Sequence, residues 1–93
     1  MTDLSIDTRI TRLTGAKYPI VQAPMGWIAR SQLAAAVSNA GGLGIIETSS
    51  GEFDKVKAEV ARMRELTDRP FGMNVALAFV KGAEAIDFVI DQG

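Results

Sequence analysis

The sequence predicts an α/β fold in which short parallel strands alternate with helices. Strand-like apolar runs begin near residues 20, 43 and 71, which places them 23 and then 28 residues apart. A segment with apolar residues at helical spacing follows each run. This is the spacing of βαβ units, whose right-handed crossovers give a parallel sheet with the strands in sequence order and the helices on one face.

Length and composition predict one small globular domain. The chain has 93 residues, of which 47% are hydrophobic and 23% are charged, and its net charge is -1. This weak charge gives no reason to expect nucleic acid or an anionic membrane as a partner. No apolar run approaches the ~20 residues of a membrane span. We therefore expect a cytoplasmic protein.

The residue types that are missing restrict the chemistry. The chain has no cysteine and no histidine, so it has no disulfide, no thiolate nucleophile and no serine–histidine triad. Its acidic residues show no metal-ligand grouping. The segment Gly42-Leu43-Gly44 precedes a strand, whereas phosphate-binding glycines follow a strand and open a helix, so it is not a dinucleotide motif. Proton transfer would fall to Asp, Glu, Lys or Tyr18.

The N-terminal part contains a predicted short helix and the first strand. Residues 1–7 are expected to fray. Thr8 is suited to cap a helix that Gly15 would end. The run Ile20–Ala23 is typical of a short buried strand, which Pro24 would end because it cannot donate to a sheet ladder. The turn that follows either lies at a ligand-binding carboxyl edge of the sheet or is a plain proline turn after a buried strand.

The second unit begins with a helix that Ser31 is predicted to cap and that Gly41 and Gly42 end. This helix is rich in alanine, so it can pack very close to a sheet. Leu43–Ile46 follows as a wholly apolar strand, the kind that is covered on both faces. The apolar positions of the helix are Leu33, Ala34, Val37 and Ala40.

A longer helix follows the second strand. Ser49 and Glu52 have the spacing of a capping box, with Ser50 as a competing cap. Pro70 ends the helix because it disfavours helical geometry at Arg69. The apolar stripe of this helix consists of Phe53, Val56, Val60, Met63 and Leu66. Its charged residues lie off that stripe and are expected in solvent: Lys55, Lys57, Glu59, Arg62, Arg64 and Glu65.

Residues 71–76 are the third predicted strand. Asn74 lies near the carboxyl end of this strand, and its neighbours on the same face, Gly72 and Ala76, are small. A polar residue in such a place is unusual for a central strand. This asparagine either satisfies a neighbouring loop or aims its amide at a closely bound ligand. Alternation puts Phe71, Met73 and Val75 on one face and Gly72, Asn74 and Ala76 on the other. The stripe of a last helix consists of Ala83, Ile86, Val89 and Ile90, and Gly93 ends it.

Three blocks of the sequence strongly resemble the nitronate monooxygenase family, formerly called 2-nitropropane dioxygenases. These blocks are Pro19–Met25, Leu33–Gly44 and Pro70–Val75, which stand in the order expected for the family. The resemblance covers about residues 8–93. The superfamily also contains flavin-dependent enoyl-acyl-carrier-protein reductases, and the three blocks do not separate the two activities.

The resemblance implies an FMN-binding TIM barrel that oxidises alkyl nitronates with molecular oxygen. By similarity, the turn formed by Ala23, Pro24 and Met25 lies against the isoalloxazine ring, and Asn74 hydrogen-bonds to the flavin. No catalytic residue is assigned to this chain, because the family's catalytic histidine and glycine-rich phosphate loops come from later strands. A complete barrel takes ~250 residues. Residues 1–93 are therefore expected to form the first three of its eight βα units, preceded by a short helix.

The resemblance leaves alternatives open. The segment Glu47–Ser50 stands where the family usually has a glycine- and alanine-rich exit from the second strand, so the subgroup is open. One alternative is NAD(P)H-dependent enoyl reduction, and another is a non-catalytic α/β fragment that only binds or assembles. Three strands with helices on one side leave an open sheet face and two unpaired edges. Such a chain is expected to persist as an open sheet, a self-associated oligomer or a molten collapse. Because it has no histidine and no phosphate loop, we expect it to turn over nitronate no faster than free FMN does.

Overall fold

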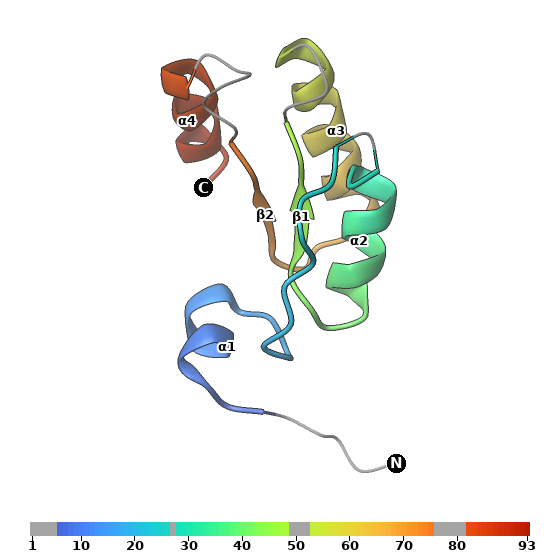
Figure 1. The fold of residues 1–93 in the computed structure, drawn as a ribbon, viewed down its shortest axis with the longest axis vertical. Coiled ribbons are helices and arrows are strands. Elements are labelled where there is room, and N and C mark those ends of the chain that lie inside the picture. The colour runs from blue at the N-terminus through green and yellow to red at the C-terminus, as the bar shows by residue number, and fades with distance from the viewer. Residues whose placement is uncertain (1–5, 27, 49–52, 76–81) are drawn as a thin grey trace.

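The computed structural model describes residues 6–26, 28–48, 53–75 and 82–93. The elements in chain order are α1 (Arg9–Thr14), α2 (Ser31–Asn39), β1 (Gly44–Ile46), α3 (Phe53–Leu66), β2 (Phe71–Met73) and α4 (Gly82–Asp91). The molecule is elongated, measuring 44 × 23 × 21 Å, because α1 lies below the amino ends of the strands (Figure 1). No helix in the described ranges combines the length and the hydropathy that crossing a membrane requires.

The sheet consists of β1 and β2, which lie side by side and run parallel (Figure 1). Gly44 pairs with Phe71, and Ile46 pairs with Met73. The predicted alternation of helices with parallel strands in sequence order is confirmed for these two strands. The third predicted strand, residues 71–76, was too long: β2 ends at Met73. The backbone pairing continues only to Asn74, whose N–H donates to the carbonyl of Ile46 at 2.9 Å.

The first predicted strand, Ile20–Ala23, was wrong in extent. Only Val21 pairs in a sheet-like way, through a single parallel bridge to Leu43. Two backbone hydrogen bonds support it: the N–H of Leu43 donates to Ile20 at 2.8 Å, and the N–H of Gln22 donates to Leu43 at 3.0 Å. Beyond Gln22 the two backbones no longer pair directly. The segment therefore lies beside β1, as the predicted order requires, without forming a full strand.

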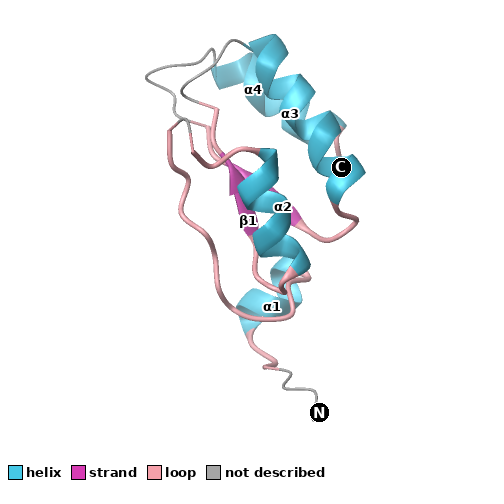
Figure 2. Cartoon of the chain, turned by 90° about the vertical axis from the view of Figure 1, so that its right-hand side faces the viewer, coloured by secondary structure: helices cyan, strands magenta, loops and turns pink. Residues whose placement is uncertain are grey.

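The hydrophobic core lies between the sheet and the helices α2 and α3. Figure 2 shows α2 in front of β1. The core is formed by the buried residues Ala34, Ala35, Ile46, Val60 and Met63, with Phe71, Met73 and Phe88 packed against them. Both α2 and α3 therefore cover the same face of the sheet, as the βαβ spacing predicted.

Gly44 allows α2 to lie directly against β1. A Cβ atom at this position would stand 2.0 Å from the carbonyl oxygen of Ala34. Ala34 and Ala35 are both buried at this contact. The prediction that the alanine-rich helix packs very close to the sheet is confirmed, and the closeness requires a residue without a side chain on the strand.

The predicted caps of α1 are confirmed, whereas the predicted cap of α2 was wrong. Thr8 and Thr11 form a reciprocal capping box, and Gly15 ends α1 with a φ of 80°. Ser31 is the first residue of α2 and not its N-cap; Arg30 holds the N-cap position and makes no side-chain cap hydrogen bond. The capping group is instead the Glu59 carboxylate of α3, which accepts from the N–H of Ser31 at 2.9 Å.

Two of the predicted apolar stripes were partly wrong. In α3, Val56, Val60 and Met63 are buried, but Leu66 is 41% exposed and lies in the last turn. In α4, Ile86 and Ile90 are 47% and 69% exposed. The contacts of α4 come instead from buried Ala85 and from Phe88, whose ring meets Phe53 edge-on at 5.5 Å. The capping positions Ser49, Ser50 and Glu52, the strand position Ala76 and the side chain of Ala83 lie outside the described residues.

Candidate functional site

The candidate site is the carboxyl edge of the sheet, at the upper end of the strands in Figure 1. The segment after Val21, the residues after β1 and the residues after β2 all arrive there, because the three segments run parallel. This edge brings together the predicted turn Ala23–Met25 and the predicted Asn74, separated by the end of β1. Parallel sheets bind their ligands at such an edge.

The side-chain amide of Gln22 links the first segment to β1 where the backbones separate. Its Oε1 accepts from the backbone N–H of Ile45 at 3.1 Å, and its Nε2 donates to the carbonyl of the same residue at 3.1 Å. The Nε2 also donates to the carbonyl of Ala23 at 2.6 Å. Sequence reasoning missed this residue. The available indication was a polar side chain with both a donor and an acceptor inside an apolar run.

The turn that follows is exposed at the surface. Ala23, Pro24 and Met25 are all exposed, with Met25 at 38%. The carbonyl of Met25 accepts hydrogen bonds from the N–H groups of Ala29 at 2.8 Å and Ile28 at 3.2 Å, which close the turn. The structure therefore presents the three predicted residues on a hydrogen-bonded loop with their side chains accessible.

Asn74 is braced through its backbone. The buried hydroxyl of Thr48 donates to the carbonyl of Asn74 at 2.7 Å. In the described ranges, no hydrogen bond involves the side-chain amide of Asn74, which is half-buried. The loop is thus held by the main chain, which leaves the amide for another partner. Little space lies beside Gly72 on the same strand, since a Cβ there would stand 2.7 Å from Cδ1 of Ile45.

A charged cluster fixes the far end of the loop. Glu47 is 4% exposed, its Oε1 lies 3.9 Å from Nε of Arg30, and its backbone N–H donates to Ala29 at 2.9 Å. The carboxylate of Glu59 accepts a hydrogen bond from the N–H of Ser31. Sequence reasoning placed Glu59 in solvent, which was wrong: it is half-buried and hydrogen-bonded, because α3 packs across the first turn of α2.

The pKa of Glu59 reflects two opposing effects. Burial raises the pKa of this carboxyl, whereas hydrogen bonds from the hydroxyl and the backbone N–H of Ser31 lower it, as do the positive charges of Arg30 and Arg62. The net result is a pKa below the ordinary value of 4.5. Glu59 is therefore ionised at neutral pH and caps α2 as a carboxylate.

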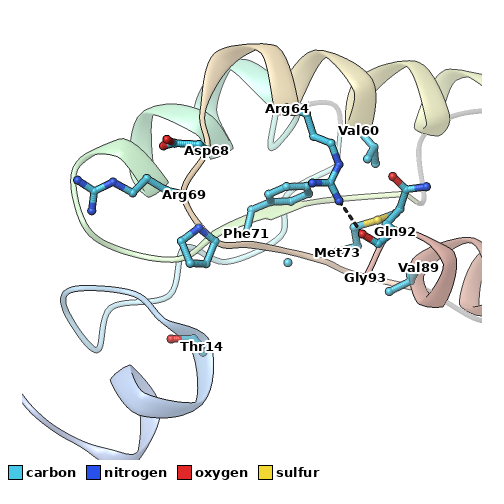
Figure 3. A pocket seen from close by; sticks show the side chains of 12 residues that line it. Thr14, Val60, Arg64, Asp68, Arg69, Phe71, Met73, Val89, Gln92 and Gly93 are labelled. Atoms are coloured by element: carbon cyan, nitrogen blue, oxygen red, sulfur yellow. Dashed lines mark hydrogen bonds between the residues drawn. The ribbon is translucent and has the colours of Figure 1, made fainter.

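A cavity of about 420 Å³ lies away from this edge (Figure 3). Its walls come from β2, the segment that leads into it, and the C-terminal ends of α3 and α4, with Thr14 below. Arg64 spans it, donating to the carbonyl of Gln92 at 2.9 Å and lying over the ring of Phe71 at 5.6 Å. None of Ala23–Met25 or Asn74 lines this cavity. We place the candidate site at the carboxyl edge, because the ends of the parallel segments meet there.

The chemistry of the edge is that of a binding surface. The described ranges contain no group of three or more acidic or other metal-ligating side chains that could hold a metal ion. What the edge offers is an exposed apolar turn on one side and a side-chain amide on the other. A flat, partly aromatic ligand with hydrogen-bonding atoms along its rim would match both.

Comparison with known proteins shows the family to which the chain is similar. A sequence model described as nitronate monooxygenase matches residues 7–91. The nitronate monooxygenase of Pseudomonas aeruginosa is 49% identical over 67 residues, which are 72% of this chain and 19% of that protein. A protein of Mycobacterium tuberculosis named (3aS,4S,5R,7aS)-5-hydroxy-7a-methyl-1-oxo-octahydro-1H-indene-4-carboxyl-CoA dehydrogenase is 33% identical over 90 residues, 97% of this chain and 25% of that protein.

A solved structure gives the same picture of the fold. FabK from Thermotoga maritima superposes with a TM-score of 0.89 at 35% sequence identity, covering 95% of this chain and 28% of that chain. The chain thus spans about a quarter or less of the length of the curated relatives it matches. The similarity extends through both parts of the carboxyl edge, since residues 7–91 include the turn and Asn74.

Proposed function

Because this chain belongs to the nitronate monooxygenase family, we propose that it supplies the first three βα units of an FMN-binding TIM barrel that oxidises alkyl nitronates with molecular oxygen. The observation that carries the proposal is the carboxyl edge itself. The exposed turn Ala23–Met25 and the unengaged amide of Asn74 stand on parallel segments at one edge. Both are parts of the sequence that the family comparison covers.

The residues present fit the ring end of a flavin. The side chains of Ala23, Pro24 and Met25 are accessible and apolar, which suits contact with the face of an isoalloxazine ring. The amide of Asn74 can both donate and accept, as the polar edge of the ring requires. When bound, FMN would supply the chemistry that the side chains lack: it accepts electrons from the nitronate and passes them to oxygen.

The phosphate end of FMN would be held elsewhere in the protein. Arg30, the cation nearest this edge in sequence, faces the carboxylates of Glu47 and Glu59 and is engaged with them. The described ranges contain no histidine, since the chain has none. The role of residues 1–93 is accordingly to bind and orient the ring, while the acid–base and phosphate-binding groups come from later units.

A second candidate is reduction of an enoyl thioester with NAD(P)H. One specific observation favours it: the relative from Mycobacterium tuberculosis that matches over 97% of the chain is named a dehydrogenase of a carboxyl-CoA compound, which is a thioester. The same flavin position would serve both reactions, because in both the substrate must approach the ring beside the carboxyl edge. The two candidates differ in both the electron donor and the electron acceptor: nitronate and oxygen in the first, NAD(P)H and the enoyl thioester in the second. They do not differ in the part of the site described above.

One experiment separates these functions. The whole protein that contains residues 1–93 is purified, and its flavin is identified after release by heat. Oxygen uptake with an alkyl nitronate is then compared with anaerobic oxidation of NAD(P)H in the presence of an enoyl thioester. Bound FMN with nitronate-dependent oxygen uptake supports the first proposal, and thioester-dependent NAD(P)H oxidation supports the second. Purification without flavin and without either activity would leave a binding or assembly role.

A further inference from the structure

Gln22 replaces a piece of sheet ladder with a side chain. On its amino side, the pairing between the first segment and β1 uses backbone groups of Ile20, Gln22 and Leu43. The next rung, at Ile45, is made entirely by the Gln22 side-chain amide, which binds both the N–H and the carbonyl of that residue at 3.1 Å. A carboxamide has the donor and acceptor of a peptide group, so it can take the place of one.

Because side-chain hydrogen bonds replace backbone pairing at Ile45, the main chain can leave the sheet early. The side chain reaches across to Ile45, so both polar groups of Ile45 stay satisfied although the backbone beyond Gln22 no longer pairs with them. The second hydrogen of Nε2 binds the carbonyl of Ala23 at 2.6 Å. The Gln22 amide therefore binds both β1, at Ile45, and Ala23, the first residue of the turn.

We propose that Gln22 is a positioning residue that sets the direction in which the turn Ala23–Met25 leaves the sheet. The inference rests on the proposed function, in which this turn contacts the flavin ring. The position requires an amide: both Nε2 hydrogens are used and Oε1 accepts, so all three hydrogen bonds have defined partners. A carboxylate of the same size would face two carbonyl oxygens, those of Ile45 and Ala23, without a proton to offer them.

The decisive variant is Gln22→Glu, because its effect depends on protonation. A carboxylate at this position repels the two carbonyls, whereas a protonated carboxyl has one donor and one acceptor and can restore the two-point contact with Ile45. Gln22→Met keeps the length and removes every hydrogen bond without adding charge. The matched control is Gln32→Glu, which adds the same charge on the exposed side of α2.

The readouts separate positioning from general stability. FMN affinity and the visible absorption spectrum of the bound flavin are measured in the whole protein at pH 7 and pH 4, each variant against the unaltered protein at the same pH. We expect FMN binding to weaken roughly 10-fold in both Gln22 variants at pH 7, with a shifted flavin spectrum. The Glu variant should recover at pH 4, the Met variant should not, and Gln32→Glu should be unchanged.

A second measurement does not require flavin. Hydrogen exchange and chemical shifts of the Ile45, Ala23 and Met25 amides are recorded by NMR in the whole protein without FMN, where the Gln22 variants should lose protection at Ile45 and shift at the turn. If the exchange rates of the turn amides and the FMN affinity both change less than about twofold in both variants, the positioning role is overturned. If no FMN binds even to the unaltered protein, the proposed function fails, and the turn amides alone decide whether Gln22 positions this segment.

Discussion

The backbone N–H of Ser31 donates a hydrogen bond of 2.9 Å to the carboxylate of Glu59, which lies 28 residues further along the chain. The contact joins the first turn of α2 to the middle of α3. It also anchors the loop that carries Ala23–Met25, because that loop leads directly into Ser31. One carboxylate thus caps a helix and fixes the end of the candidate site.

This contact predicts a loss of stability in acid. Because the pKa of Glu59 is lowered in the folded protein, its contribution is complete above its ordinary value of 4.5 and is lost as the pH falls through the folded pKa. Glu59→Ala should lower the free energy of unfolding by about 1 kcal/mol at pH 7, as loss of a helix cap does. Solvent screening reduces this loss, because Glu59 is only half-buried. The cost should shrink as the pH is lowered toward 3, because the carboxylate takes up a proton as the pH falls through its folded pKa.

Urea denaturation at both pH values measures the difference. Glu65→Ala, an exposed position on the same helix, serves as the control. An equal loss from Glu59→Ala at pH 7 and near pH 3 would show that the side chain contributes packing and not charge.

The close contact of Gly44 with Ala34 predicts a severe effect of a single methyl group. A Cβ at position 44 would meet backbone atoms of α2, at 2.0 Å from the carbonyl oxygen, and backbone cannot move aside as a side chain end can. We expect Gly44→Ala to cost 1–3 kcal/mol or more, the range of overpacking in a core. Gly26→Ala is the control, since nothing lies within 4 Å of its Cβ position. Thermal denaturation of both variants measures the difference. Equal melting temperatures would contradict the prediction.

Local patterns predicted most of the fold. The strands β1 and β2, the positions of α2 and α3 and the caps of α1 follow from hydrophobic spacing and from residues close in sequence, such as Thr8 and Thr11. These features depend on neighbours a few residues away. They can therefore be inferred before any tertiary contact is known.

The errors arise where distant segments decide the outcome. Ser31 looked like a cap, but its partner is Glu59 on another helix. The predicted strand at Ile20–Ala23 is cut short because the side chain of Gln22 takes over the pairing with Ile45. Helical periodicity predicted an apolar stripe on α4, but it could not predict which side of the helix packs against α3. That side carries Phe88, whose ring contacts Phe53. At the candidate site the sequence indicated Ala23–Met25 and Asn74, and missed the groups that hold them.

The exposed apolar residues of the first segment predict self-association of the isolated chain. Ile20 is 63% exposed, Val21 53% and Ile28 64%, and the parallel pairing beside them is a single bridge. Burying such residues against a second copy is favourable by about 25 cal/mol per Å². Sedimentation velocity of the 93-residue chain should show species larger than a monomer, and Val21→Lys should reduce them. Ala58→Lys, on the exposed face of α3, is the charge-matched control; a monomer at all concentrations would exclude the idea.

The isolated chain is expected to be inactive with nitronate. It has no histidine, and the proposed role of its edge is to orient a ring, so residues 1–93 are not expected to hold FMN by its phosphate or to assist the reaction of the nitronate. Oxygen uptake by the chain with added FMN and an alkyl nitronate should equal that of FMN alone. Uptake well above that control would mean that residues of this chain assist the reaction themselves, or that several copies assemble a complete site.

The most direct test of the candidate site is Asn74→Leu in the whole protein. Its backbone carbonyl is held by Thr48 and its N–H binds Ile46, so the substitution keeps both main-chain contacts and removes only the amide. If that amide binds the flavin edge, its loss leaves polar ring atoms unpaired in a dry site, at a cost of about 1–3 kcal/mol. FMN affinity should fall roughly 5- to 150-fold, measured by fluorescence titration, with little change in the melting temperature of the apoprotein.

Asn39→Leu provides the opposite pattern. The side chain of Asn39 binds the carbonyl of Leu66 at 3.2 Å and the hydroxyl of Thr67, at the amino end of the strands and away from the candidate site. This variant should lower the melting temperature and leave FMN affinity within about twofold, because it breaks a structural contact only. Were Asn74→Leu to behave in the same way, with lower stability and unchanged affinity, Asn74 would be a loop-bracing residue and the flavin contact would have to be sought elsewhere on the edge.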